Sequence, residues 1–181
     1  AARSELLRLI VAMIDRAPDD SPFPKADVGI EGALEAAMAR MPAVEAEEGF
    51  RRDLAGGRFR DRAAGRALEG PHRTDLVIRH RPKDMPAARC STGEQKALLI
   101  GLVLAHARLT GELAGMAPII LLDEIAAHLD AGRRAALYGI IDGLGGQAFM
   151  TGTDRALFSG LGAGARFFEV SPGAVIPADS G

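Results

Sequence analysis

An apolar run that ends in two consecutive carboxylates constrains this chain more than any other feature of its sequence. The run extends from Ile119 to Leu122, and Asp123 and Glu124 follow it directly. Such a run predicts a strand over 119–123 that is buried on both faces, as in a parallel sheet. Parallel strands end at the crevice where α/β folds bind ligands, so both carboxylates are expected there.

The chemistry of these two carboxylates suits phosphate transfer. Asp123 can hold Mg²⁺ directly or through water, because this ion prefers a few carboxylates together with phosphate oxygens. Glu124 can orient or deprotonate a water for attack on a γ-phosphate. Taken alone, the pair is more often a strand that runs into an acidic turn.

A second motif, Ser91-Thr92-Gly93-Glu94-Gln95, precedes a long apolar segment. Either Ser91 with Glu94 or Thr92 with Gln95 has the spacing of a capping box at a helix start. The free N–H groups and the dipole of such a helix also favour an anion. Gly93 would let a phosphate approach the backbone closely, and the Ser91 hydroxyl could donate to a phosphate oxygen.

A third motif lies just after the carboxylates and ends in Leu129-Asp130. By itself it predicts a helix start with Asp130 as the N-cap.

Hydrophobic periodicity and turn residues predict the remaining elements. Helices are expected over 1–16, 32–40, 43–65, 92–111 (apolar nearly all round, and therefore buried), 131–143 and 155–161. Strands are expected over 26–32, 75–81, 119–123, 147–151 and, as the last one, 166–170. The alternation of strands and helices in the second half predicts a mostly parallel α/β sheet with flanking helices.

Composition excludes several classes of protein. The 181 residues are 48% hydrophobic and 25% charged, with a net charge of −2, which is typical of a globular protein without bulk attraction to nucleic acid or membrane. A single cysteine, Cys90, excludes an internal disulfide and a cysteine-cluster zinc site. No signal peptide is evident, and the apolar stretches are too short to span a bilayer. A soluble, cytoplasmic protein is expected.

One local patch departs from this neutral balance. The stretch from Arg51 to Arg81 contains nine arginines against four acidic residues. Contact with a DNA backbone is one interpretation, and a solvated helix face or contact with another part of the protein is the other. Only Phe50 and Phe59 interleave, so stacking on single-stranded bases is not expected.

The three motifs occur in the order used by ATP-binding-cassette ATPases, and the chain resembles that superfamily. Residues 90–95 match the signature motif, 119–124 the Walker B strand and 127–130 the D-loop. Over residues 23–172 the finer resemblance is to the RecF family of recombination mediators. It rests on 70–76, on the Ser-x-Gly-Glu-Gln signature and on 150–154, where Thr153 occupies the switch position.

The resemblance implies a C-terminal lobe of an ATPase head over 66–181, preceded over 1–65 by the end of a helical arm domain. It implies ATP and Mg²⁺ as cofactors, with Glu124 catalytic and Asp123 on the metal. The residues implied to contact the nucleotide are Ser91, Gly93, Glu94, Gln95, Asp130 and Thr153. Two heads would sandwich two nucleotides, with Ser91 and Gly93 reaching the γ-phosphate of the other head.

The implied biology is DNA replication, recombinational repair and the SOS response. The expected partners are DNA (a duplex or a single-strand/double-strand junction), a second copy in an ATP-dependent homodimer, and mediators of the RecR and RecO type. No membrane partner is expected.

One expected element is missing from the sequence. No Gly-x-x-x-x-Gly-Lys-Ser/Thr phosphate loop occurs, and none of Lys25, Lys83 and Lys96 follows a glycine. The chain is therefore expected to begin after that loop and to hydrolyse no ATP alone. A strand near 119–122 would then be uncovered, so the chain is expected to self-associate or to bind a partner that supplies the missing part.

Two other classes of protein remain open. The first is the head of a chromosome-maintenance ATPase or of a transporter, although Thr153 and residues 1–65 argue against a transporter. The second is a non-enzymatic interaction module on the same fold, against which Glu124 speaks, since a dead site need not keep both carboxylates.

Overall fold

A computed structural model describes residues 2–124 and 129–178. The chain divides into two compact units, Ala1–Leu109 and Thr110–Gly181. Ala127 and His128 of the expected D-loop lie outside the described residues. The boundary expected between an arm and a head at residue 65 stays a prediction.

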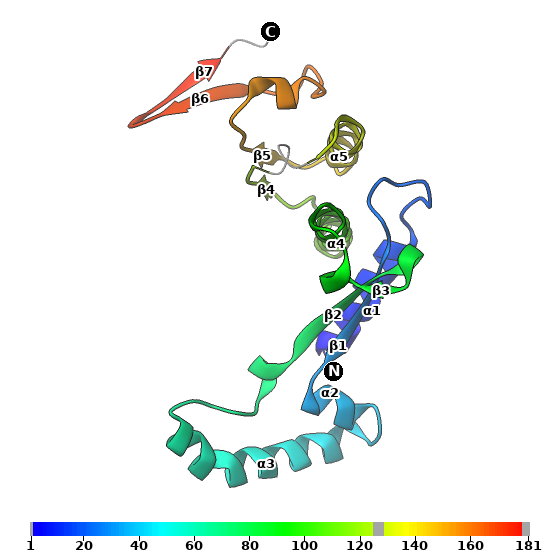
Figure 1. Ribbon diagram of the computed structural model, residues 1–181, viewed down its shortest axis with the longest axis vertical. Coiled ribbons are helices and arrows are strands. Elements are labelled where there is room, and N and C mark those ends of the chain that lie inside the picture. The colour runs from blue at the N-terminus through cyan, green and yellow to red at the C-terminus, as the bar shows by residue number, and fades with distance from the viewer. Residues whose placement is uncertain (1, 125–128, 179–181) are drawn as a thin grey trace. The chain divides into compact units, whose positions relative to one another are not determined.

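The first unit combines helices with a small antiparallel sheet (Figure 1). Its elements are α1 (Ala2–Asp15), β1 (Ala26–Glu31), α2 (Ala33–Met38), α3 (Ala43–Ala64), β2 (Asp75–His80), β3 (Met85–Pro86) and α4 (Thr92–Ala114), with 3-10 turns η1 (Pro71–Arg73), η2 (Arg81–Lys83) and η3 (Ala87–Arg89). The strand order is β1-β2-β3, and the β1–β2 register runs from Ala26 opposite His80 to Glu31 opposite Asp75. Helices α2 and α3 form the connection between β1 and β2, and this connection leaves and re-enters the strand pair at its Glu31–Asp75 end.

The core of the first unit forms where α1 meets α4. Met13 and Ile14 of α1 cluster with Ala105 and Leu109 of α4, and Val28 of β1 packs against them. These side chains recur at the helical and strand spacings that bring apolar residues onto one face.

Helix α4 is less buried than its sequence predicts. Leu99 is 57% exposed and Val103 is 41% exposed, so the expectation of a helix buried all round is wrong. Part of the apolar surface of α4 is therefore exposed within the described residues. By length and composition alone α4 could cross a membrane, but 39% of its most apolar window is buried, and core helices of soluble proteins pass the same test.

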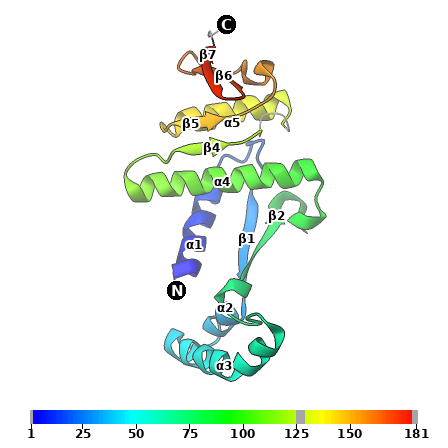
Figure 2. The same cartoon turned by 90° about the vertical axis from the view of Figure 1, so that its left-hand side faces the viewer.

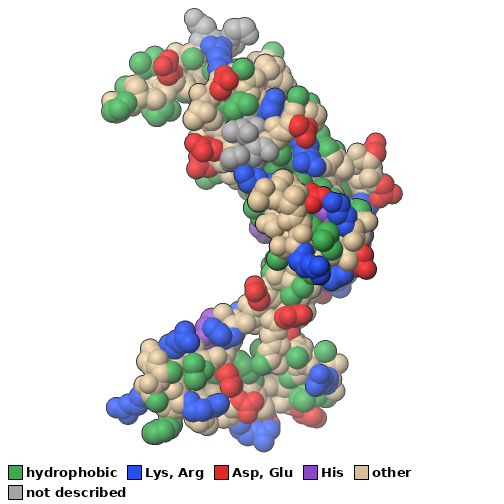
Figure 3. Space-filling model, in the orientation of Figure 1, with side chains coloured by type: hydrophobic (Ala, Val, Ile, Leu, Met, Phe, Trp, Pro, Cys, Tyr) green, Lys and Arg blue, Asp and Glu red, His purple; other side chains and the backbone are tan. Residues whose placement is uncertain are grey.

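Helix α3 has almost no buried face. Only Ala46 and Gly57 of its 22 residues are buried. The helix ends at Gly65, whose φ of 65° is a left-handed C-cap that glycine adopts without strain. Lys and Arg side chains gather over this region in the space-filling view (Figure 3).

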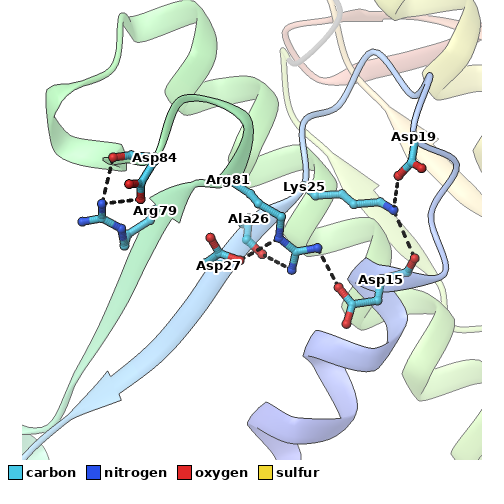
Figure 4. Close-up of polar contacts among 8 residues, drawn as sticks. All are labelled: Asp15, Asp19, Lys25, Ala26, Asp27, Arg79, Arg81 and Asp84. Carbon is cyan, nitrogen blue, oxygen red and sulfur yellow. Dashed lines mark hydrogen bonds and ion pairs between the residues drawn. The ribbon is translucent and has the colours of Figure 1, made fainter.

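A polar cluster joins α1, β1 and the end of β2 (Figure 4). The Arg81 guanidinium donates to Asp27 Oδ1 at 2.6 Å and to Asp15 Oδ1 at 2.8 Å. Lys25 donates to Asp19 Oδ1 at 2.6 Å and to the Asp15 carbonyl at 3.2 Å. Charged hydrogen bonds of this kind fix the ends of the three elements.

The second unit contains a parallel strand pair, a helix and a hairpin (Figure 2). Its elements are β4 (Ile120–Leu122), α5 (Ala131–Gly143), β5 (Ala148–Met150), the 3-10 turn η5 (Arg155–Phe158), β6 (Phe167–Ser171) and β7 (Ala174–Ala178). β4 pairs with β5 in parallel, and β6 pairs with β7 in antiparallel register. The expected parallel sheet is thus limited, among the described residues, to two strands.

Strand β4 alternates instead of being buried on both faces. Ile120 and Leu122 are buried, whereas Leu121 is 74% exposed, so the expected two-sided burial is wrong. Phe149 lies opposite Leu121 on β5 and is 54% exposed. The sequence shows that all these residues are apolar, but how many layers cover them depends on the rest of the fold.

The C-terminal end carries a strand that the sequence analysis did not predict. After β6 a tight turn leads into β7, and Gly173 has a φ of 78°. The Pro172-Gly173 pair is a turn signal that predicts a return strand. The expectation that residues 166–170 form the last strand is therefore wrong.

Candidate ATP-site segments

Asp123 and Glu124 directly follow β4, and Thr151, which directly follows the neighbouring strand β5, contacts both of them. Leu122 is in register with Met150, so the residues after each strand are neighbours. The Thr151 hydroxyl donates to Asp123 Oδ1 at 2.5 Å. The same hydroxyl oxygen accepts the Glu124 backbone N–H at 2.9 Å. One hydroxyl thus fixes both the Asp123 side chain and the Glu124 backbone.

Glu124 has an unusual backbone conformation. Its φ is 49°, in the left-handed region that residues other than glycine seldom adopt. Such conformations cost of order 1–3 kcal/mol and cluster at functional sites. The hydrogen bond to Thr151 helps to hold this conformation, and the Glu124 side chain is exposed.

The carboxylate at position 123 suits a metal that takes most of its ligands from elsewhere. In the described part of the chain, Thr151 occupies Oδ1 of Asp123, and Oδ2 has no hydrogen-bond partner. Among the described residues, no group of three His, Cys, Asp or Glu side chains forms a metal cage. A single exposed carboxylate with one free oxygen could serve as one ligand of a hard cation whose other ligands are waters or phosphate oxygens.

The start of α4 is a complete capping box. Ser91 N–H donates to Glu94 Oε2 at 3.0 Å, and the Ser91 hydroxyl donates to the same oxygen at 2.9 Å. The Glu94 N–H in turn points at the Ser91 hydroxyl at 3.4 Å. Of the two pairings that the sequence allowed, the structure contains Ser91 with Glu94. The Gln95 amide instead donates to the Cys90 carbonyl at 3.0 Å.

A lysine that the sequence analysis passed over completes this motif. Lys83, in η2, pairs with Glu94 Oε1. The Lys83 contact, followed by the hydrogen bonds from Ser91, lowers the pKa of Glu94 to about 2. The sequence held no signal for this pair, since the turn that brings Lys83 back toward α4 depends on β2 and β3.

Neither crowding by neighbouring atoms nor backbone conformation requires a glycine at position 93. A Cβ built there meets nothing within 4 Å, and its φ is not positive. Glycine in a helix costs roughly 0.5–1 kcal/mol relative to alanine. The space over Gly93 is therefore free for a group from outside this chain.

Asp130 and Thr153, the two remaining residues of the predicted site, differ in their contacts. Asp130 caps α5, since its side chain accepts the Arg133 N–H at 2.8 Å. Thr153 is exposed in a bend after β5, and no hydrogen bond joins it to the other described residues. The neighbour of Asp123 is Thr151, two positions earlier, which sequence reasoning did not single out.

The predicted site residues therefore form two groups. The residues from Ser91 to Gln95 belong to the first unit. Asp123, Glu124, Asp130 and Thr153 belong to the second, together with Thr151.

Comparison with known proteins finds RecF proteins that are similar to this chain in sequence and in fold. No protein-family profile matches the chain. The DNA replication and repair protein RecF of Brucella abortus (strain 2308) is 70% identical over 173 residues, which is 96% of this chain and 45% of that protein. The protein of the same name from Mesorhizobium japonicum is 67% identical over 179 residues, 99% of this chain and 47% of that protein. The chain therefore matches the C-terminal part of these RecF proteins over nearly its whole length.

Solved RecF structures share the fold. One, described as the recombination mediator protein RecF-ATPrS in the RecFOR pathway, has a TM-score of 0.72 at 19% identity. The alignment covers 98% of this chain and 46% of that one. A second, described as RecF-ATP, has a TM-score of 0.71. The chain spans about half the length of the RecF proteins that it matches.

Proposed function

We propose that this chain supplies the signature and Walker B parts of the ATP site in a RecF-type DNA-repair ATPase. The observation that carries the proposal is the Thr151 hydroxyl bound to both Asp123 and Glu124. It holds the Asp123 carboxylate and the Glu124 backbone at the end of a parallel strand pair, where α/β folds bind ligands. RecF structures described as ATP complexes have this fold.

Each carboxylate is assigned one task. Asp123 would hold Mg²⁺ through its free oxygen, and the metal would neutralise charge on the β- and γ-phosphates. Glu124 would orient the attacking water and accept its proton. The phosphate-binding loop would come from the part of the protein that corresponds to the rest of the RecF sequence.

The signature segment would serve the nucleotide of a second copy. Gly93 leaves open space at the start of α4, where N–H groups and the helix dipole favour a phosphate. The Ser91 hydroxyl would have to leave Glu94 to donate to that phosphate. Glu94 and Gln95 would hold the segment in shape. Asp130 and Thr153, which belong to the second unit, would each contact a nucleotide as well.

The proposed setting follows from the same assignment. The complete protein would be a weak ATPase that dimerises on DNA when ATP is bound, in the cytoplasm. Its partners would be duplex DNA or a duplex junction and mediators of the RecR and RecO type. Replication, recombinational repair and the SOS response are the processes proposed.

Mixing two inactive variants of the complete protein tests the shared site. Ser91→Ala and Glu124→Gln should each lower ATP turnover, by on the order of a hundredfold for the proton acceptor. In a mixed dimer, one nucleotide would meet an intact Glu124 and an intact partner Ser91. Mixing should therefore restore part of the turnover.

Two results would count against the proposal. No recovery on mixing would mean that the signature does not act across a dimer. ATP turnover by the 181-residue chain alone, abolished in Glu124→Gln, would mean that the chain needs no partner. Asp142→Asn is the matched control, since Asp142 is an exposed carboxylate on α5 that should leave turnover unchanged.

A further inference from the structure

Helix α3 carries an arginine stripe, which we define as Arg51, Arg58 and Arg62. At about 100° per residue, these three side chains fall within roughly 40° of one another around the helix axis. All three are exposed. The buried residues Ala46 and Gly57 lie on a different side of the helix.

The stripe forms no ion pair within the part of the chain that the structure describes. Arg60, on another side of α3, pairs with Glu69 at 3.4 Å. Neither ion pairs nor hydrogen bonds engage the guanidinium groups of Arg51, Arg58 or Arg62 among the described residues. Asp53 lies on another side of the helix, whereas Glu47 and Asp61 lie four and three residues from Arg51 and Arg58, at neighbouring positions of the helix surface. Neither carboxylate contacts a stripe guanidinium among the described residues.

Helix stability accounts for only part of the stripe. A positive charge in the last turn interacts favourably with the helix dipole, which explains Arg62. Arg51 lies in the middle of the helix, beyond the range of that effect, and its spacing of four residues from Glu47 would contribute only about 0.2–0.5 kcal/mol. Arg58 and Arg62 are four residues apart, a like-charge spacing that costs about 0.2–0.5 kcal/mol.

We infer that the arginine stripe binds the phosphate backbone of duplex DNA. At 1.5 Å of rise per residue the stripe extends for roughly 16 Å, and B-DNA presents one negative charge for about every 1.7 Å of its axis. Several phosphates therefore lie within reach of three guanidinium groups, which match phosphate geometry well. Among polyanions that three arginines could bind, we choose DNA because the RecF relatives are named DNA replication and repair proteins. The inference rests on the proposed function only in identifying the bound polyanion as DNA.

The surface around the stripe favours backbone contact over base readout. Phe59 is 83% exposed beside the stripe, but a lone aromatic ring does not make a stacking platform. Phosphate contacts fix position without reading sequence. The stripe should therefore bind duplexes of different sequence alike, and more weakly as salt rises.

Fluorescence anisotropy with a labelled duplex tests this surface. The 181-residue chain is titrated without nucleotide, so the outcome is independent of the ATP site. Wild type should bind, and the triple variant Arg51→Gln, Arg58→Gln, Arg62→Gln should bind about tenfold or more weakly at low salt. The slope of log affinity against log salt should fall by about three, close to one for each phosphate that an arginine no longer neutralises.

Two matched variants complete the design. Changing the exposed Arg8, Arg40 and Arg166 to glutamine removes the same charge elsewhere and should alter affinity by less than about twofold if contact is local. Lysines at the three stripe positions should retain binding, because charge is kept. Glutamine and lysine are both good helix formers, so helix content by circular dichroism should not change.

Three results would overturn the inference. The first is an unchanged affinity and salt slope in the glutamine triple variant. The second is an equal loss in the control triple variant. The third is a wild-type chain that does not bind duplex DNA, or that binds single-stranded DNA more tightly than duplex DNA. A failed ATPase test with an intact stripe effect would reject the proposed function alone.

Discussion

The hydroxyl of Thr151 serves two neighbours at once. It donates to a carboxylate side chain and accepts from a backbone N–H, and so uses its hydrogen atom and one lone pair. A serine could do the same, and a valine of nearly the same shape could do neither. This difference separates a positioning role from simple packing.

Thr151→Val should therefore destabilise the chain by about 1 kcal/mol, the usual net worth of a hydrogen bond or two near the surface. Thr151→Ser should recover most of that stability. Urea unfolding at neutral pH measures both. Thr153→Val is the control, expected to be neutral within about 0.5 kcal/mol; a larger effect at 153 than at 151 would reverse the assignment.

The Glu94 carboxyl makes the start of α4 sensitive to acid. Its pKa is about 2 in the folded chain, below the ordinary value of 4.5, because of Lys83 and then Ser91. A lowered folded pKa contributes stability that is fully present above the unfolded value. That contribution disappears as pH falls from about 4.5 toward 2.

Glu94→Gln should remove this part of the acid sensitivity. Between pH 4.5 and 2, the unfolding free energy of the variant should fall less steeply than that of wild type. Thermal unfolding followed across this pH range gives the comparison. Glu45→Gln, which changes an exposed carboxylate without a described partner, should keep the wild-type slope. Equal slopes in the Glu94 variant and wild type would contradict the prediction.

Among the elements, α3 differs from its neighbours because it is held by few apolar contacts. Its stability depends on local propensity more than on packing. Two adjacent glycines, Gly56 and Gly57, lie within the helix, and a Cβ at Gly56 meets nothing within 4 Å. Gly65, by contrast, needs its left-handed conformation to end the helix.

Gly56→Ala should consequently stabilise the chain by about 0.5–1 kcal/mol. Gly65→Ala should destabilise it by roughly 1 kcal/mol, since a Cβ is strained at a φ of 65°. Thermal unfolding with circular dichroism distinguishes the two. Opposite signs are the expected result, and a destabilised Gly56 variant would show that α3 makes contacts through that face.

The positions of most elements follow from sequence periodicity and turn residues. The spans of α1, β1, α3, β2, α5 and β5 agree with the predicted ranges to within one or two residues. Local rules suffice here because caps and breakers such as Asp130 and Gly65 act within one turn. The residue pairs Ser91–Glu94 and Asp130–Arg133 were predictable for the same reason.

Contacts between distant segments were not predictable in this way. Lys83 meets Glu94 only because of a turn and a two-residue strand, and Thr151 meets Asp123 only because β4 and β5 pair in one register. The exposure of Leu121 also depends on what covers the sheet. An apolar run reports that burial is favourable, but not whether another layer is present.

For the whole molecule, the β4–β5 pair leaves an apolar patch on its open face. We define this patch as Ile119, Leu121 and Phe149, which are 64%, 74% and 54% exposed. Among the described strands β4 has a single neighbour, so one of its edges also stays unpaired. Exposed strand edges and apolar patches both promote association.

The 181-residue chain should therefore self-associate as its concentration rises, and Leu121→Lys should weaken that association. A charge on the patch opposes both sheet extension and apolar contact. Sedimentation velocity over a concentration series measures the effect. Val44→Lys, which changes a residue 71% exposed on α3, is the control and should associate like wild type. Equal association of both variants would place the contact elsewhere.

The left-handed backbone at Glu124 affects how variation at this position should be interpreted. A β-branched residue such as valine or threonine would be strained there whatever chemistry the site performs. Asparagine, aspartate and glycine tolerate the conformation best. When aligned relatives are compared, an absence of β-branched residues at 124 would thus report backbone geometry, and only a preference for glutamate over asparagine or glycine would report selection for a proton acceptor.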